Sequence, residues 1–277
     1  MRHPNSAHPH SSNRPHRCSF SPPALLCLTG LLATLACGED GGSNATPAHE
    51  AASSTSTFQL LQAYEPAAGR PGSSAIAADD ARFVAWATDF AGTLALGSGV
   101  DEGWDDPEQA LGPAQGITET VLSIGNGGEV TLTFDAPITD GDGADFAVFE
   151  NAFDDFFLEL AFVEVSSNGE DFQRFDCAYL GEEPIGQYDT HDCELIGGLA
   201  GKYRGGFGTP FDLAQLHSKE LVEEGQLDLD AITHVRIVDV IGDGSMEDSF
   251  GHPIYDPTPT VGSGGFDLDG IGVINSR

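Results

Sequence analysis

The chain has few basic residues. Its 277 residues include 11 lysines and arginines against 44 aspartates and glutamates. Three arginines lie in residues 1–36, which hold no acidic residue, so residues 37–277 carry 8 basic and 44 acidic side chains, a net charge of −36. Such a surface repels nucleic acid and anionic lipid headgroups and favours divalent cations or cationic partners. We therefore expect no nucleic-acid partner, although a solvated acidic surface without a partner explains the charge equally well.

The chain also lacks an apolar run that could span a bilayer. Ala24–Ala36 is apolar over 13 residues, whereas a membrane-spanning helix needs about 20. This run follows three arginines and ends at Cys37, and a tract rich in Gly, Ser, Ala and Thr follows it. The arrangement resembles a bacterial lipoprotein signal, in which Cys37 becomes the lipidated first residue. Thr34 stands where such signals usually carry Leu, and ordinary secretion is the alternative.

These features divide the chain into three parts. We expect a signal peptide over residues 1–36, a flexible tether over 37–57 and a single β-sandwich domain over 58–277. The expected location is the bacterial cell envelope, on its outer surface or periplasmic face. Membrane contact is then limited to the lipid on Cys37, and the protein is secreted if Cys37 is not acylated.

Cysteines are scarce in the expected domain. Cys18 and Cys27 precede Cys37, so only Cys177 and Cys193 remain. Because an exported chain folds in an oxidising compartment, we predict a Cys177–Cys193 disulfide. Closing a loop of about 15 residues would stabilise the fold by roughly 3 kcal/mol. A zinc pair is the alternative, but a second pair of ligands is missing.

Apolar and polar residues alternate with period two in the stretch 128–175, which is the pattern of half-buried strands. It begins with Val130, Leu132 and Phe134, which alternate with polar residues. Further strands are predicted at Phe146–Phe149, Leu158–Val165, Phe172–Tyr179, Thr233–Ile241 and Phe266–Ile274. No amphipathic helix separates the first four strands, and the chain holds 35 Gly and 16 Pro. We expect an all-β fold, an antiparallel, jelly-roll-like β-sandwich with long loops and one or two short helices.

Helical segments are expected to be few and short. Asp79 and Asp80 could cap a helix over Ala81–Ala87, Asp106 a single turn from Pro107, and Asp212 a helix over Leu213–Glu224. The sequence Gly-Asn-Gly-Gly at 125–128 predicts a hairpin turn. Residues 242–265 show no periodic pattern, and long loops in compact domains are usually functional or disordered. Because this loop carries several acids, His252 and Tyr255, we favour a functional loop.

Several segments occur in one order across Ala67–Asn275. They are DDARFVAWATDF, ITDGDGADFAVFENAF, LAFVEVSSNGEDFQRF, GLAGKYRGGFGTPFDL, THVRIVDV and GHPIYDPTPTVGSGGFDLDGIGVIN. Together they resemble a family of bacterial exported β-sandwich domains that are described as cell-surface proteins, many with a C-terminal sorting tail. The resemblance implies a jelly-roll-like sandwich at the cell surface and no established activity. This chain ends at Arg277 without such a tail, and we expect the N-terminal lipid to replace that anchor.

A calcium site is predicted from three aspartates near two strand ends. Asp267 and Asp269 are two residues apart, so they share one face of a strand about 7 Å apart. Asp239 has the parity of the apolar residues before it. Carboxylate oxygens suit Ca²⁺. In the alternative reading, Asp267 and Asp269 face solvent and Asp239 caps a turn. Asp140, Asp142 and Asp145 form a second acidic cluster, which ordinary turn residues also explain.

A ligand site is predicted on the loops. Glu150 has inward parity at the end of its strand, and Asn151 follows it. Aromatic and arginine side chains on loops over a rigid sandwich are typical of modules that bind sugars or other small molecules, although packing beneath the loops is an equal alternative. Tyr188 also lies on such a loop. The candidate ligand-binding residues are Glu150, Asn151, Tyr203, Arg204, Phe207, His252 and Tyr255.

The chain lacks the motifs of common hydrolases. No G-x-S-x-G, H-E-x-x-H or Cys-His nucleophile context occurs, and the histidines lack metal-type spacing. We therefore expect a non-catalytic surface lipoprotein that binds an extracellular glycan or other small molecule, stabilised by Ca²⁺. One alternative is a structural or adhesive envelope protein without a small-molecule site. Another is a glycoside-type hydrolase, in which Glu150 works with a second carboxylate.

The first prediction concerns Cys37. An apolar run that ends at this cysteine predicts its acylation, so cells fed an alkyne fatty acid should yield labelled protein. The Cys37→Ala variant should carry no label. Label that persists in this variant would contradict the prediction.

Overall fold

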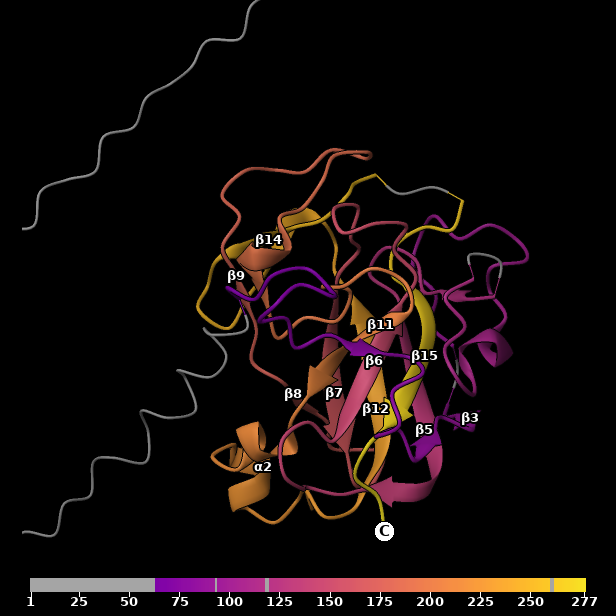
Figure 1. The fold of residues 1–277 in the computed structure, drawn as a ribbon, viewed down its shortest axis with the longest axis vertical. Coiled ribbons are helices and arrows are strands. Elements are labelled where there is room, and N and C mark those ends of the chain that lie inside the picture. The colour runs from indigo at the N-terminus through magenta and orange to yellow at the C-terminus, as the bar shows by residue number, and fades with distance from the viewer. Residues whose placement is uncertain (1–62, 93, 118–119, 260–261) are drawn as a thin grey trace, which may run out of the picture. The chain divides into compact units, whose positions relative to one another are not determined.

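The computed structural model describes residues 63–92, 94–117, 120–259 and 262–277 (Figure 1). The expected signal peptide and tether, with Cys37, lie outside the described residues. In the described part of the chain, no helix has the length and apolar character needed to cross a bilayer.

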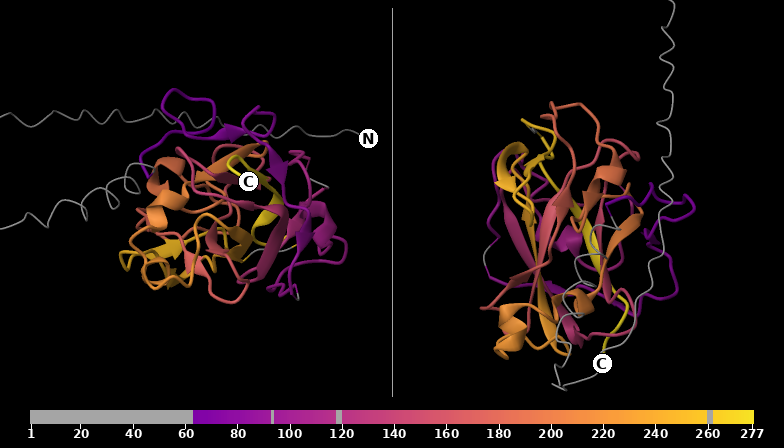
Figure 2. Two further views of the ribbon diagram at one scale, coloured as in Figure 1. Left: turned by 90° about the horizontal axis from the view of Figure 1, so that it is seen from below. Right: turned by 90° about the vertical axis from the view of Figure 1, so that its left-hand side faces the viewer.

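Two antiparallel sheets form two layers (Figures 1 and 2). In spatial order the first sheet consists of β1 (Ile76–Ala77), β11 (Phe207–Phe211), β6 (Phe146–Glu150), β15 (Asp267–Val273) and β2 (Ala85–Trp86), with β4 (Leu122–Ser123) also paired to β15. The second consists of β3 (Asp89–Phe90), β5 (Glu129–Ile138), β12 (Ile232–Asp239), β7 (Ala161–Ser166) and β8 (Gln173–Arg174). The predicted all-β antiparallel sandwich is confirmed.

Smaller elements connect the sheets. Two two-stranded ladders pair β9 (Ala178–Tyr179) with β10 (Ile196–Gly197) and β13 (Asp243–Glu247) with β14 (Pro253–Tyr255). The helical elements among the described residues are η1 (Pro107–Ala110), η2 (Cys193–Leu195), η3 (Leu213–Leu216) and α2 (Glu220–Glu223). The carboxylates of Asp106 and Asp212 cap η1 and η3 by accepting from the backbone N–H two residues on, as predicted for these two residues.

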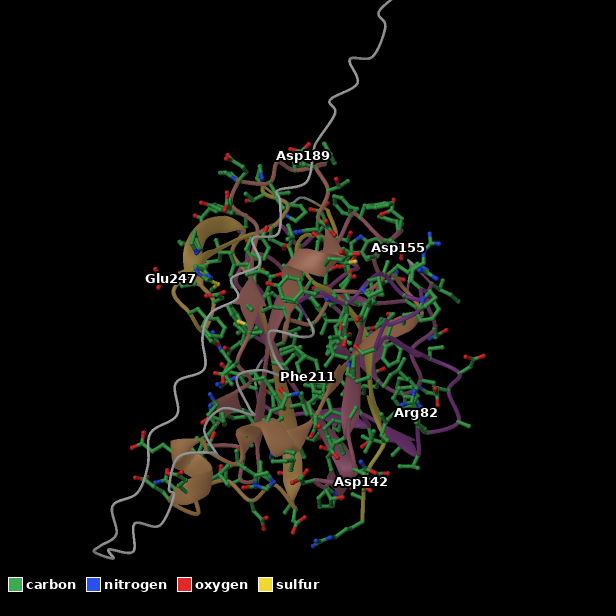
Figure 3. All side chains as sticks on the ribbon, turned by 60° about the vertical axis from the view of Figure 1, so that its left-hand side comes forward. Arg82, Asp142, Asp155, Asp189, Phe211 and Glu247 are labelled. Carbon is green, nitrogen blue, oxygen red and sulfur yellow. The ribbon has the colours of Figure 1, made fainter. Side chains whose placement is uncertain are left out.

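Apolar side chains from both sheets fill the space between them. Inward residues of β5, β7 and β12 meet those of β6, β11 and β15 in one buried cluster. Phe146 of β6 stacks on Phe211 of β11, with ring centroids 5.4 Å apart, and meets Phe175 edge-on at 5.9 Å. Phe211 is labelled in the interior in Figure 3. This core holds the strands rigidly, so the residues at the strand ends have fixed positions.

Strand pairing brings acidic residues of both sheets to one end of the sandwich. Glu150, the last residue of β6, pairs with Leu268 near the start of β15. Asp239, the last residue of β12, pairs with Ala161 at the start of β7. The loops beyond these positions carry Asp155 and Asp189, whereas Asp142 lies at the opposite end (Figure 3). We call the end marked by Asp155 and Asp189 the loop end.

Two predictions of local structure are wrong because tertiary contacts decide them. The helix expected over Ala81–Ala87 is absent, and β2 pairs with β15 instead. Trp86 packs on Phe83, with ring centroids 5.0 Å apart, and on Phe149 of β6, with ring centroids 5.3 Å apart, and its pairing with Gly272 of β15 holds the backbone extended. The turn at 125–128 is not a hairpin, because β4 before it pairs with β15 while β5 after it belongs to the other sheet.

Three other segments differ from the prediction: two are each divided into two shorter elements, and one expected loop contains paired strands. The strand expected over Phe172–Tyr179 becomes β8, which pairs with β7, and β9, which pairs with β10. The helix expected over Leu213–Glu224 is broken into η3 and α2. The loop 242–265 contains the β13–β14 ladder, whose irregular register explains why no period was visible.

The predicted Cys177–Cys193 disulfide is wrong in this structure, where both cysteines are buried free thiols. The ladder of β9 and β10 explains why. Cys177 directly precedes Ala178, which pairs with Gly197, whereas Cys193 lies three residues before Ile196, which pairs with Tyr179. In an antiparallel pair these positions lie at opposite ends of the ladder. Burial raises the pKa of Cys177 to about 11, which keeps its thiol protonated.

The second prediction tests the core. Phe146→Ala removes a fully buried ring that contacts two others, so we expect a loss of about 3–5 kcal/mol in the free energy of unfolding. Phe153→Ala, at a side chain that is 74% exposed, should change it by less than about 0.5 kcal/mol. Urea titration followed by circular dichroism measures both. Equal losses would contradict the described packing.

Candidate functional site

Five buried carboxyl groups gather at the loop end. We call them the acidic cluster: Glu150, Glu159, Asp239, Asp256 and Asp267. Each is at most 8% exposed. They come from both sheets, since β6 and β15 contribute one each, β12 contributes one, and the others precede β7 and follow β14. Their charges act on one another, because neighbouring members of the cluster raise the pKa of Glu150, Glu159 and Asp239.

The acidic cluster differs from a buried acid that has cationic partners. Glu164 of β7 is also buried, and it accepts from Nε of Arg174 at 2.8 Å and from Nε of Arg236 at 2.6 Å. Elsewhere in the described part of the chain, four ion pairs join arginine or lysine to acids outside the cluster: Arg82–Asp80, Arg204–Asp155, Lys219–Asp176 and Arg277–Asp230. The cluster therefore gathers negative charge that these cations do not offset.

Burial raises the pKa values throughout the acidic cluster, and repulsion by neighbouring carboxyls raises those of Glu150, Glu159 and Asp239 further. Burial is the largest cause for all five carboxyls, and it raises the pKa of Asp267 to about 7. His191 does not neutralise the negative charge of the acidic cluster. Its Nε2 lies 3.0 Å from Oδ1 of Asp256, but burial lowers the pKa of His191 to about 4, so the ring is neutral at neutral pH. In this arrangement the cluster holds protons near neutral pH.

Local hydrogen bonds fix the members to different degrees. Asp239 accepts from the backbone N–H of Gly127 at 2.8 Å and of Phe266 at 2.7 Å, so both of its oxygens are used. A Cβ on Gly265 would lie 2.6 Å from Oδ1 of Asp239, which is why a glycine with positive φ stands there. Glu159 differs, because no described group donates a hydrogen bond to its carboxyl. Its oxygens are available to a ligand.

A cavity of about 170 Å³ opens beside the acidic cluster. Its lining includes Glu150, Asn151, Phe153, Glu159, Tyr188 and Asp267. Asn151 is only 7% exposed, and its Nδ2 is the one fully buried side-chain nitrogen or oxygen among the described residues that has no hydrogen-bond partner. Buried polar groups are rarely left unpaired, so this amide is an exception in a residue that lines the cavity.

Two exposed aromatic rings stand at the mouth of the cavity. Phe153 is 74% exposed and Tyr188 is 78% exposed, although both are large side chains. They belong to the loops that carry Asp155 and Asp189, which Figure 3 labels at the loop end. The site thus has an aromatic rim above a polar, acidic floor.

The three aspartates predicted to bind calcium do not lie in one site. Asp239 and Asp267 belong to the acidic cluster, but Asp269 accepts from the backbone N–H of Gln115 at 3.0 Å and of Gly116 at 2.7 Å. The pairing of β15 with β6 shifts register between Leu268 and Gly270. This irregularity breaks the alternation that would have placed Asp267 and Asp269 side by side.

The predicted ligand residues are likewise divided. Glu150 and Asn151 line the cavity. Tyr203 is 1% exposed and shares hydrogen bonds with Ser74 and Glu65, while Arg204 pairs with Asp155 and lies over the ring of Phe207. His252 pairs with Asp248, and the ring of Tyr255 meets that of Tyr179. The last five predicted residues, from Tyr203 to Tyr255, do not line the cavity.

A second acidic group lies near the opposite end. Oxygens of Asp140, Asp145 and Asp212 lie within 4.8 Å of one another, whereas Asp142 does not join them. Asp145 accepts from Gly141 N–H at 2.8 Å, from Leu213 N–H at 2.7 Å and from Nδ2 of Asn275 at 2.8 Å. Asp140 pairs with Nε2 of His217 at 2.7 Å. These contacts are those of a structural junction.

Sequence reasoning missed Glu159 and Phe153 as site residues. Residues 158–166 are buried at nearly every position, so period-two parity could not show which side Glu159 faces. The signal that could have found it is a lone acid in the apolar stretch Leu158-Glu159-Leu160. Phe153 could have been found as an aromatic residue directly after the Glu150–Asn151 pair.

Comparisons of the chain with protein-family models, with curated proteins and with solved structures find no significant match.

The third prediction concerns pH. A carboxyl whose pKa is higher in the folded than in the unfolded state binds extra protons when folded, so its contribution to stability is lost as pH rises through the folded pKa. In metal-free buffer we expect the free energy of unfolding to fall between about pH 4 and 7, on the order of a few kcal/mol, given the pKa of about 7 for Asp267.

Glu159→Gln should make this fall shallower, because Glu150, Asp256, Asp267 and Asp239 then repel one fewer charge. Glu183→Gln, at an exposed glutamate, is the control and should leave the slope unchanged. Urea titrations at several pH values provide the measurement. A stability that stays constant or rises over this range would be inconsistent with the described cluster.

Proposed function

We propose that the protein is a non-catalytic module of the bacterial cell surface that binds an extracellular glycan or other small molecule at the cavity of the loop end. The observation that carries the proposal is the cavity itself, which joins an exposed aromatic rim to a floor holding the unpaired amide of Asn151.

The aromatic rim supports a ligand with apolar faces. Exposing Phe153 and Tyr188 leaves large apolar areas in water, which a folded chain tolerates at a binding surface. Aromatic rings bury much area and lose little conformational entropy on binding, because they have few rotatable bonds. Sugar rings present C–H faces that can stack on such side chains.

The floor supports a ligand that also carries hydroxyl groups. The carboxyls of Glu150 and Glu159 line the cavity and can accept hydrogen bonds from hydroxyl donors. A ligand that left these buried groups unpaired would lose the corresponding hydrogen-bond energy, so the floor selects for polyhydroxylated molecules.

The size of the cavity limits how the ligand enters. Pockets for drug-sized ligands usually have volumes of about 300–1,000 Å³, and this cavity has about 170 Å³. A sugar therefore lies across the rim and inserts one edge, which is the mode expected of a module that holds one unit of a longer glycan.

Only the sequence supports the proposed surface location. The segment before Cys37 supports export and lipid anchoring, and the tether 38–57 would place the binding domain away from the membrane.

A glycoside hydrolase is the second candidate, and one observation favours it. Glu150 and Asp267 line the same cavity, and a carboxyl with a pKa near 7 such as Asp267 is protonated often enough to act as a general acid.

The fourth prediction tests binding. A glycan array and a small-molecule screen probed with the purified protein should yield a specific hit. Tyr188→Ala and Phe153→Ala should each weaken that hit at least about fivefold, since stacking on an aromatic ring contributes on the order of 1 kcal/mol or more and both rings line the cavity. Their melting temperatures should equal that of the unmodified protein, because both side chains are exposed.

Phe250→Ala is the matched control, since this phenylalanine is also exposed but does not line the cavity. Turnover of the hit would instead establish the hydrolase. A silent array and screen would refute the proposal and favour a structural or adhesive envelope protein.

A further inference from the structure

We propose that two adjoining clefts beside the loop after β9 bind an aliphatic polyamine, a hydrocarbon chain that carries several ammonium groups. Tyr179, Gly181 and Glu182 line both clefts, whose volumes are about 330 and 320 Å³. We call them the paired clefts. Volumes of this size are usual for small-molecule sites. The paired clefts share no lining residue with the cavity of about 170 Å³, so the inference does not rest on the proposed function.

The first support is a buried hydroxyl without a partner. Tyr179 is 2% exposed, its ring meets those of His191 and Tyr255 edge-on, and no described group forms a hydrogen bond with its hydroxyl. A Cβ on Gly181 would lie 2.6 Å from this hydroxyl, which therefore stands beside a residue that lines both clefts. The hydroxyl is not among the fully enclosed atoms that lack a partner, so it keeps accessible surface. Buried polar groups are rarely left unpaired, and a ligand in the clefts can supply the partner.

The second support is the sign of the charge around the paired clefts. Glu182, Asp189 and Asp192 line them, and no described lysine or arginine does so. Asp189, labelled at the loop end in Figure 3, accepts from the backbone N–H of Gly186, and Asp192 accepts from that of Glu194. In the described part of the chain, none of these three acids joins an ion pair. Positively charged N–H donors on a ligand complement such a lining.

His252 supplies a fixed acceptor to the cleft of about 330 Å³. Its Nδ1 lies 3.1 Å from Oδ2 of Asp248, a carboxylate that also accepts from the backbone N–H of Tyr179 at 2.8 Å. Because an ionised carboxylate can only accept, Nδ1 carries the proton, and Nε2 of the neutral ring is an acceptor. The side chain of His252 is 56% exposed, so a ligand can reach it. This residue, predicted from the sequence to bind a ligand, therefore lines the paired clefts rather than the cavity.

Apolar residues in the lining favour a hydrocarbon chain between the charges. Leu180 and Pro253 line one cleft, and Pro184 and Ile185 line the other. Methylene groups in contact with these side chains are removed from water, which stabilises the complex. A chain that crosses from one cleft to the other passes Tyr179, whose hydroxyl can accept from an ammonium group. A metal ion would use the acids but not the apolar lining, so the lining as a whole fits a polyamine better.

The test uses spermidine as the probe. Calorimetric titration of spermidine into the purified protein should show one saturable event in about 0.15 M NaCl, which screens exposed charges beyond roughly 8 Å. Putrescine should compete with spermidine for the site. The diol with the same four-carbon chain as putrescine should not compete, because it lacks the ammonium groups.

Two substitutions locate the site. Tyr179→Phe removes only the unpaired hydroxyl, so it should weaken spermidine binding about tenfold and leave the melting temperature unchanged. Glu182→Gln should weaken binding about threefold, because one partly exposed carboxylate is lost. Tyr255→Phe and Glu170→Gln are the matched controls and should bind normally. Tyr255 packs on Tyr179 without lining either cleft, and Glu170 is exposed between β7 and β8.

Four outcomes overturn the inference. The first is the absence of a saturable event, and the second is competition by the diol that equals that of putrescine. The third is full-strength binding by Tyr179→Phe or, if that variant melts at a lower temperature, by Glu182→Gln. The fourth is an equal loss of binding in Glu170→Gln and Glu182→Gln, which would show a general attraction of cations to the acidic surface.

Discussion

The excess of acidic over basic side chains is the constraint on which the rest of this structure depends. With 44 acids and 11 lysines and arginines, the chain cannot give each buried carboxylate a cation. It uses two arginines for Glu164, and it uses backbone N–H groups for Asp239 and Asp269. Backbone donors are numerous where strands end in loops, which explains why many buried acids stand at strand ends.

The acidic cluster lacks the arginine partners that Glu164 has. Antiparallel pairing fixes Glu150 and Asp239 at the end of the sandwich, and the packed core prevents their strands from moving apart. Buried carboxyls without a cationic partner at such a rigid position lower the stability of the fold, and the packed core must offset this loss. Local losses of stability of this kind are common at functional sites. Glu159 and Asn151 show this most directly, because neither gains a visible structural partner for its free polar atoms.

The predictions from sequence succeeded where one face of a strand is exposed to solvent and failed where both faces are buried. Period-two alternation located β5 and β12 and the inward parity of Asp239. It could not locate Glu159, since its neighbours are buried on both sides, nor foresee the register shift that separates Asp269 from Asp267. The disulfide failed for a related reason, because spacing along the chain says nothing about the ladder that places Cys177 and Cys193 at opposite ends.

The site itself depends on contacts that no single segment encodes. Glu150 and Asp267 belong to one sheet, Asp239 to the other, and Asp256 to the segment after β14, so their proximity exists only once the two sheets are packed. Local composition identified most of these acids individually. Their common burial, which makes them a cluster rather than a solvated surface, follows from the long-range pairing of β6 with β15 and of β12 with β7. Charge composition thus predicts an excess of acids, and topology decides which of them are buried together.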